Sequence, residues 1–396
     1  MTESTSPHHI VVAGYFPPPT TGQAVATERV AGLLDSAGEL VRVSLQGTHS
    51  RGVRAEAAPT LSGTLGYARA ARAWRRELRR YPSATVLWTS ISAKAAGHLR
   101  DTLLVLPAFA PSQRVFGVVH WGGFERLGAV PWMRPLVARM VRRLNGVVFL
   151  DRSLADACAG FIPEHKRLVV PNTISDDVIA SGPELDVRRA PWAESRALRV
   201  LFFSNMLPEK GYGDVVRAIG RMRSDGVAVE ATFAGAWPDD GQAHRFAHLV
   251  EECGAGDAAT YVGAVRERAD VRRLMLGHDV LAFPSSYASE AQPLVILEAF
   301  ACGTPIVTTT VGAIPNIVTD GVEGRLVMPG DAAAVADALM QFQDRAWWLA
   351  ASHAARARFD AQFSPDVVRR AWLHAISTVP PSRHDDATGS RHGPYP

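Results

Sequence analysis

Short, almost continuous apolar runs alternate with helical patterns along most of the chain. His9–Tyr15 is such a run. A loop rich in Pro, Thr and Gly follows it, and Ala24–Ser36 then has the pattern of a helix. Strands that are buried on both faces of a sheet lack polar alternation, and strands joined by helices run parallel. This opening therefore predicts a doubly wound α/β domain.

The alternation occurs twice, and an irregular stretch between Val169 and Arg196 separates the two sets. The first set continues with strands at Leu40–Ser44, Thr85–Thr89, Arg114–His120 and Gly146–Leu150 and a helix at Leu65–Tyr81. The second set has strands at Arg199–Ser204, Ala228–Ala234, Tyr261–Val262, Val280–Phe283 and Pro305–Thr309 and helices at Gly213–Ser224, Gln242–Cys253 and Pro293–Cys302. The separating stretch combines Pro, Gly and charge without apolar periodicity, which is typical of a linker.

The length of 396 residues fits two domains of ordinary size. We predict a front domain over residues 1–185 and a rear domain over 186–365. A helix over 366–379 should pack back towards the front domain, and a disordered tail should cover 380–396, where Pro, Ser, Asp, His and Gly dominate.

Composition excludes several classes of protein. The three cysteines show no paired spacing, so neither a disulfide framework nor a zinc site is indicated. The first apolar stretch is too short for a signal peptide, and no apolar run reaches the roughly 18 residues that span a bilayer. We therefore expect a cytoplasmic protein that at most lies peripherally at the inner membrane face.

Positive charge is concentrated in the first half. Residues 1–190 hold 23 Lys and Arg against 15 Asp and Glu. The helix ARAARAWRRELRRY, residues 68–81, carries much of this charge together with Trp74 and Leu78. It fits either a helix that rests on an anionic bilayer or an ordinary basic helix that covers the sheet. No basic patch interleaved with aromatic residues supports nucleic-acid binding.

The segment from Ser285 to Gly303 carries the strongest local signal. A strand ends at Phe283, a polar loop follows, and Pro293 stands where the first helical position is expected. The N–H groups of Leu294 and Val295 then point out of the positive end of a helix, at the carboxyl edge of a parallel sheet. Such a position binds phosphate.

Two carboxylates flank this predicted phosphate site. Glu298 lies one turn into the helix and is suited to ribose hydroxyls, and Glu290 precedes the helix and reaches another part of the ligand. The alternative is that Glu290 is a solvated loop residue and Glu298 a surface helix residue.

The segment resembles the Glu-x7-Glu motif of the retaining glycosyltransferases of family 4, the largest group with the GT-B fold. The resemblance covers most of the chain, from FPPPTTGQ through VVPN and LFFSNMLPEKGYGDVVRAI to GAIPNIVTDGVEGRLV. It implies two Rossmann-like domains facing a central cleft, in which the front domain binds an acceptor and the rear domain binds a nucleotide sugar.

Several residues take expected roles from this resemblance. Lys210 in PEKG would place its ammonium on the diphosphate. The arginine that usually lies five residues earlier is Asn205 here, which loses bidentate binding. Gly22 matches the first loop that approaches donor and acceptor, although the second glycine of that loop is Gln23. His120 would face the donor sugar across the cleft.

The rear domain supplies the other expected contacts. Glu290 would hold sugar hydroxyls, and Gln292 and Pro293 stand where a Gly-Phe-Gly pattern is commoner. Pro293 removes one N–H donor. Val265, in YVGAV, matches the position that holds the base.

The predicted function is retaining, metal-independent transfer of a sugar from a nucleotide-diphosphate sugar to an acceptor hydroxyl. His120, Glu290 and Lys210 would be the catalytic residues. No Asp-x-Asp motif indicates a metal, and no cofactor is expected. The acceptor is left open between a glycan, a lipid-linked sugar and a small molecule. Alternatives are another GT-B enzyme, such as an epimerase or a phosphorylase, and a non-catalytic protein that binds nucleotide sugars.

Overall fold

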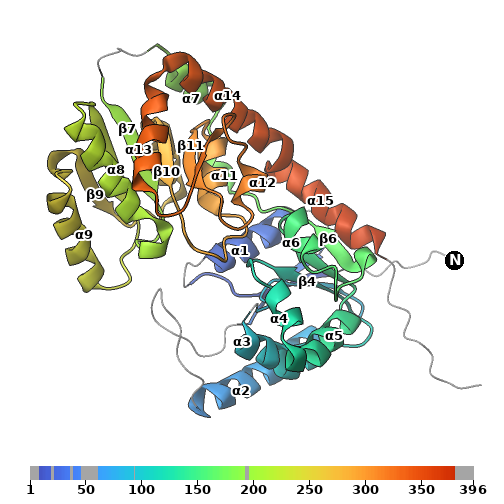
Figure 1. Cartoon of the computed structure of the whole chain (residues 1–396). Coiled ribbons are helices and arrows are strands. Elements are labelled where there is room, and N and C mark those ends of the chain that lie inside the picture. Colours follow the sequence, from blue (N-terminus) through green and yellow to red (C-terminus); the bar gives the residue numbers. More distant parts are fainter. Residues whose placement is uncertain are drawn as a thin grey trace, which may run out of the picture.

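The computed structural model describes residues 9–18, 22–35, 39–45, 61–92, 94–191 and 196–379. These residues form two α/β domains, the front domain from the first half of the chain and the rear domain from the second (Figure 1). The tail predicted to be disordered lies outside the described residues.

The front domain is built on a six-stranded parallel sheet in the order β2-β1-β3-β4-β5-β6. Its strands are β1 His9–Gly14, β2 Glu39–Ser44, β3 Thr85–Trp88, β4 Arg114–Val119, β5 Gly146–Phe149 and β6 Arg167–Val169. Its helices are α1 Gly22–Leu34, α2 Leu61–Leu78, α3 Ala95–Arg100, α4 Glu125–Ala129, α5 Arg134–Arg143 and α6 Arg152–Asp156, with a π-helical turn at Asp101–Val105 after α3. Both faces of the sheet are covered by apolar clusters.

The rear domain repeats the design with the strand order β12-β11-β10-β7-β8-β9, again all parallel. Its strands are β7 Leu198–Phe203, β8 Val229–Ala234, β9 Ala259–Gly263, β10 Val280–Phe283, β11 Ile306–Thr309 and β12 Gly324–Val327. Its helices are α7 Gly182–Arg189, α8 Tyr212–Ser224, α9 Asp240–Glu252, α10 Arg268–Gly277, α11 Leu294–Ala301, α12 Ile314–Ile317, α13 Ala332–Met340 and α14 Arg345–Gln362. The predicted fold of two doubly wound parallel-sheet domains is confirmed.

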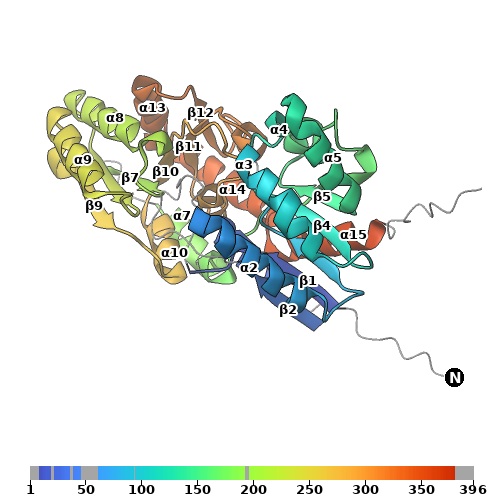
Figure 2. The same ribbon diagram turned by 90° about the horizontal axis from the view of Figure 1, so that it is seen from below.

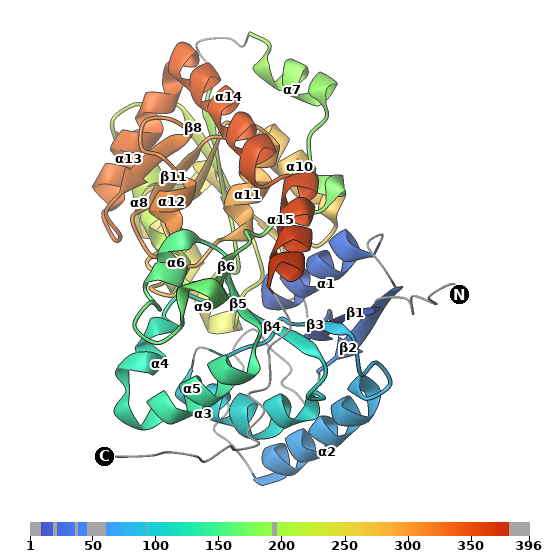
Figure 3. The same ribbon diagram turned by 90° about the vertical axis from the view of Figure 1, so that its right-hand side faces the viewer.

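Helix α15, Pro365–Thr378, leaves the rear domain and packs on the front sheet beside α1 (Figure 3). Val368 and Trp372 share an apolar cluster with Val30 of α1 and with the strands. Arg114 of β4 donates hydrogen bonds to two carbonyls at the end of α15, at 2.6 and 2.5 Å. A cation at a helix C-terminus is favourable, so this arginine helps to hold α15 on the front domain.

The stretch predicted to be an irregular linker contains helix α7. Ser181 and Glu184 form a reciprocal capping box, and a proline stands in the first turn. These are helix-start signals, although the segment lacks apolar periodicity because only Leu185 is buried. The boundary expected between residues 185 and 186 falls inside this helix, which packs against α10 of the rear domain.

Candidate functional site

The rear sheet reverses its strand order between β7 and β10, and the candidate site lies there. The loop after β7 holds Asn205 and Lys210, and the loop after β10 holds Glu290. In open α/β sheets, ligands bind at the carboxyl ends of the strands where the order reverses. The topology therefore brings together two loops whose residues lie 80 positions apart.

Lys210 and Glu290 form an ion pair in this crevice. Nζ of Lys210 contacts Oε1 of Glu290, and the same oxygen accepts a hydrogen bond from Oγ of Ser285 at 2.8 Å. The ammonium also lies 4.8 Å from the centre of the Tyr287 ring. The side chains are only 17% and 8% exposed. The family resemblance predicts that Lys210 and Glu290 contact different parts of one ligand. In this structure the two side chains contact each other instead. A ligand that binds both of them therefore has to break their ion pair.

Two glycines in left-handed conformations set the packing of these loops. A Cβ on Gly211, at φ 87°, would lie 2.2 Å from the carbonyl oxygen of Pro284. A Cβ on Gly312, at φ 58°, would lie 2.1 Å from the carbonyl oxygen of Glu290. Only glycine permits both the conformation and the close approach. The glycines of PEKG and GAIPN thus place Lys210 and Glu290.

Helix α11 begins one residue later than the sequence predicts. Pro293 is the N-cap, with φ −61° and ψ 121°, and its carbonyl accepts a hydrogen bond from Ile296 at 3.2 Å. Leu294 and Val295 therefore take the first two helical positions, whose N–H groups have no carbonyl partner within a helix. Both residues are half-buried. Their amides form the positive end of the helix, directly after the loop that holds Glu290.

Glu298, one turn further along α11, is 4% exposed. Its Oε1 accepts a hydrogen bond from Nη1 of Arg268, the first residue of α10, at 3.1 Å. Burial raises the pKa of Glu298, and the nearby charges of Arg268 and Arg29 oppose that rise. The Glu-x7-Glu motif does not predict this contact, because Arg268 reaches Glu298 only through the packing of α10 against α11.

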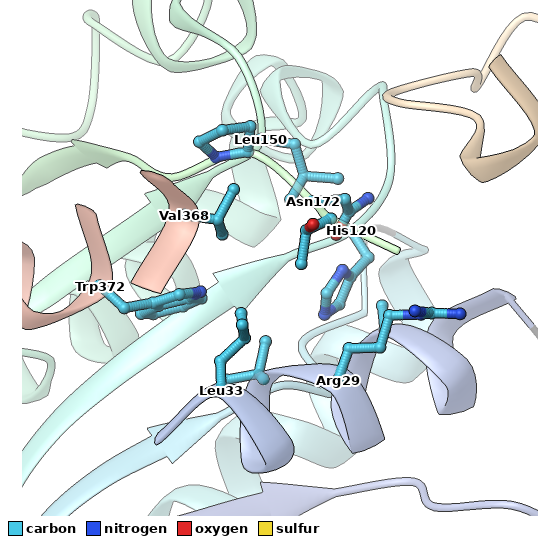
Figure 4. Close-up of a pocket in the computed structure, with 11 residues that line it drawn as sticks. Arg29, Leu33, His120, Leu150, Asn172, Val368 and Trp372 are labelled. Carbon is cyan, nitrogen blue, oxygen red and sulfur yellow. The ribbon is translucent and has the colours of Figure 1, made fainter. Parts of the chain in front are cut away.

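On the front domain, His120 follows β4 and lines a small cavity with Arg29 of α1, Asn172 and Trp372 of α15 (Figure 4). Both ring nitrogens are buried and have no hydrogen-bond partner among the described residues. Burial lowers the pKa of His120 to about 4, so the ring is neutral at pH 7. Gly22 is exposed at the start of α1.

Several hydrogen bonds join the domains around the site. The backbone N–H of Asn172 donates to Oε1 of Gln292 at 2.5 Å, and that of Gly122 donates to the carbonyl of Ser289 at 3.1 Å. The amide of Asn316 donates to a carboxylate oxygen of Asp151 at 2.8 Å. Gln292, predicted to bind the donor, thus uses its side-chain oxygen to hold the two domains together.

The two remaining predicted positions lie on the rear domain. Asn205 is exposed in the loop after β7. Val265 is half-buried and packs on the apolar cluster that includes α10 and α11. Among the described residues, no group of three or more His, Cys, Asp and Glu side chains is placed to hold a metal ion.

Comparisons with known proteins show what the chain is similar to. The family described as Glycosyl transferases group 1 matches residues 197–344. D-inositol 3-phosphate glycosyltransferase of Mycobacterium marinum is 30% identical over 217 residues, which cover 52% of this chain and 45% of that protein. Glycogen synthase of Mycobacterium tuberculosis is 28% identical over 290 residues, which cover 69% of this chain and 66% of that protein. Residues 197–344 therefore form a domain of the Glycosyl transferases group 1 family. The chain spans about half the length of the D-inositol 3-phosphate glycosyltransferases that it matches.

Solved structures show the GT-B fold over nearly the whole chain. Sucrose-phosphate synthase from Thermosynechococcus elongatus has a TM-score of 0.71 at 17% identity and covers 93% of this chain and 98% of its own. Anabaena Alr3699/HepE in complex with UDP and glucose has a TM-score of 0.69 at 16% identity and covers 94% and 100%. The fold of this chain is therefore GT-B.

The buried imidazole of His120 gives the protein a testable acid sensitivity. The unfolded chain binds a proton at His120 below its ordinary pKa of 6.5, whereas the folded chain does so only near 4. The free energy of unfolding should therefore fall between pH 6.5 and 4, by up to about 3 kcal/mol from this residue. Urea unfolding across this pH range should show a shallower fall for His120→Gln. Parallel curves for the two proteins would contradict the prediction.

Proposed function

We propose that the chain is a retaining, metal-independent glycosyltransferase that moves a sugar from a nucleotide-diphosphate sugar to an acceptor hydroxyl. The observation that supports this most is the buried pair of Lys210 and Glu290 beside the free amides of α11, with Glu298 one turn further. A cation, helix amides and two separate carboxylates match the phosphates and hydroxyls of such a donor.

The donor would lie along the start of α11. Lys210 and the amides of Leu294 and Val295 would take the diphosphate and stabilise its charge as it leaves. Glu290 would accept hydrogen bonds from the sugar, and Glu298 from the ribose. Metal independence is proposed because these cationic and amide groups meet the phosphate charge themselves.

The front domain would complete the site from the other side of the cleft. His120, neutral at pH 7, would orient the sugar by hydrogen bonding. Gly22 would approach the donor and acceptor, while Val265 would hold the base and Asn205 would donate to the diphosphate. The family implies substitution on the same face of the sugar, in which the departing phosphate helps to take the acceptor proton. Contacts such as that of Gly122 with Ser289 would keep water out of the closed cleft.

A donor screen with and without acceptor tests this proposal. UDP-sugars come first because the Alr3699/HepE structure holds UDP and glucose, and GDP- and dTDP-sugars follow. Acceptors should include glycans, lipid-linked sugars and small hydroxylated molecules. Nucleotide release that requires an acceptor, with a product of retained anomeric configuration, is the expected result. Epimerised donor, a phosphate-dependent reaction, or binding without turnover would each replace the proposal with one of its alternatives.

We further propose that the front domain contacts an anionic membrane through the arginines of α2 and neighbouring elements, but not through Trp74 and Leu78. Trp74 and Leu78 do not face a bilayer, since they are 5% and 0% exposed and Nε1 of Trp74 donates to the carbonyl of Ser44. That part of the expectation is wrong, because the apolar stripe of α2 packs on the sheet. No helix in the described part of the chain is both long and apolar enough to cross a bilayer.

The outer surface of α2, α3 and α5 has the required character. It lies on the far side of the front sheet from α1 and α15 (Figure 3), and Figure 2 shows α2 along its length. The exposed arginines of α2, of the two residues after it and of α5 are Arg69, Arg72, Arg75, Arg76, Arg79, Arg80, Arg134, Arg139 and Arg142. Exposed apolar side chains in the same part of the chain are Leu99 of α3, Leu103 of the π-helical turn and Trp132 just before α5. Exposed arginines together with exposed leucine and tryptophan side chains suit the interface of an anionic bilayer.

Charge reversal on α2 should release the protein from anionic vesicles. Each arginine near such a surface contributes about 1 kcal/mol, so Arg75→Glu with Arg76→Glu should weaken co-sedimentation with phosphatidylcholine–phosphatidylglycerol vesicles at least about tenfold. Binding should also fall with salt and be absent on pure phosphatidylcholine. The same double reversal at Arg221 and Arg223 on α8 is the control. Equal loss in both variants, or none in either, would refute this surface.

A further inference from the structure

Arg29 is a cation of the front domain that lines the small cavity with His120 and lies near enough to Glu298 of α11 to interact with its charge. It lies on the side of α1 that also contributes Val30 to the small cavity with His120. Figure 4 shows Arg29 and His120 at the end of this cavity away from Trp372. No motif of the sequence singles it out, because it is one charged residue in an unremarkable helical pattern.

Two of the three guanidinium nitrogens of Arg29 are buried and have no partner in the described part of the chain. Nε and Nη1 are both shielded from solvent, and neither has a hydrogen-bond partner among the described residues. Burial lowers the pKa of Arg29 to about 10, so the group stays charged at pH 7. A buried charge without hydrogen bonds is costly, and an arginine in this state is suited to receive an anion.

The surrounding charges place Arg29 at the nucleoside end of the site. Burial is the main cause that lowers the pKa of Arg29. The charges of Glu298, Asp176 and Asp177 oppose this lowering, and the charge of Arg268 adds to it. The two aspartates are exposed, so solvent screens them, whereas Glu298 is buried on α11. Lys210 instead lies against Glu290, the residue proposed to hold the sugar.

The rear domain has one cation fewer than its family pattern requires. Asn205 stands in place of the arginine, which leaves Lys210 as the cation of the two motif positions. A diphosphate carries two charged groups and is best met by two cations. An unpaired arginine that reaches the crevice from the opposite domain would restore this balance.

We propose that Arg29 binds the nucleoside-proximal phosphate of the donor, while Lys210 binds the phosphate next to the sugar. This rests on the proposed function, since it divides the diphosphate of that donor between the domains. This division has a consequence for closure of the two domains over the donor. A donor held by the rear domain gains the contact with Arg29 only when the front domain has closed on it. Donor binding and domain closure are thereby coupled.

Calorimetric binding of uridine, UMP and UDP tests the assignment, with the guanosine series used in the same way if the wild-type protein prefers GDP. Loss of one charge-assisted phosphate contact should weaken binding by about 10- to 100-fold. Arg29→Gln should weaken UMP and UDP by the same factor and leave uridine unchanged. Lys210→Gln should weaken UDP but not UMP.

Two further variants keep the result interpretable. Arg29→Lys retains the charge and should bind UMP more tightly than Arg29→Gln. Glu28→Gln is the control, since Glu28 lies next in the chain and is 48% exposed in an outer ion pair with Arg42; it should bind all three ligands normally. Equal UMP affinity in wild type and a folded Arg29→Gln would overturn the inference, as would an equal loss for uridine. Failure of the wild type to bind either diphosphate would instead refute the proposed function.

Discussion

Replacing Glu290 by alanine is expected to reduce sugar transfer by about 100- to 1000-fold while leaving nucleoside diphosphate binding intact or tighter. The loss follows because hydrogen bonds to a charged group contribute about 1.5–3 kcal/mol each, and the proposed sugar contacts include more than one. Binding should not fall, because Lys210 no longer has to leave Oε1 of Glu290 to reach the phosphates. Steady-state turnover and UDP calorimetry measure the two effects separately.

A matched control separates this effect from damage to the fold. Glu251 is an exposed glutamate on α9, outside the site, and Glu251→Ala should behave as wild type. Glu290→Gln keeps the volume and the partner for Ser285, so it should fold normally and still lose transfer. Normal turnover in either Glu290 variant would show that Glu290 takes no part in the mechanism. Loss of UDP binding with turnover retained would show that Glu290 serves the nucleotide rather than the sugar.

The sequence predicted the fold well because parallel strands buried on both faces leave a strong apolar pattern. β1, β4, β5, β7 and β10 all lie within a residue or two of their expected limits. The apolar pattern does not reveal β6 and β12, because they are only three and four residues long and partly buried. It does not reveal helix α7 either, which is marked by its capping box rather than by apolar periodicity. In α7 only Leu185 is buried, so this helix contributes little to the core.

The candidate site could be predicted only in part. Spacing and turn signals place Glu290, Leu294 and Glu298 along one helix start, because those positions are local in sequence. The pairing of Lys210 with Glu290 depends on the crossover that sets β7 beside β10, which one-dimensional spacing does not reveal. Arg29 was missed for the same reason, since it approaches from the other domain and carries no motif.

The position of α15 makes the front domain depend on the end of the chain. Trp372 is 2% exposed and lies in the cluster that covers one face of the front sheet, with Val30 of α1 and Phe116 of β4. Most other members of that cluster lie more than 180 residues earlier in the chain. The helix that carries Gly22 and Arg29 therefore rests partly on a side chain supplied after the rear domain is complete.

Trp372→Ala should accordingly destabilise the front domain by about 3–5 kcal/mol, the range for removal of a buried aromatic side chain. The space left would join the small cavity that Trp372 already lines, so surrounding side chains have little means of closing it. Urea unfolding should show the front-domain transition moving to lower denaturant while the rear-domain transition stays near its wild-type position. Trp132→Ala, which removes a tryptophan that is 59% exposed, is the control and should leave both transitions in place. A Trp372→Ala loss below about 1 kcal/mol, the size of a typical point substitution, would mean that α15 merely lies on the front domain without supporting it.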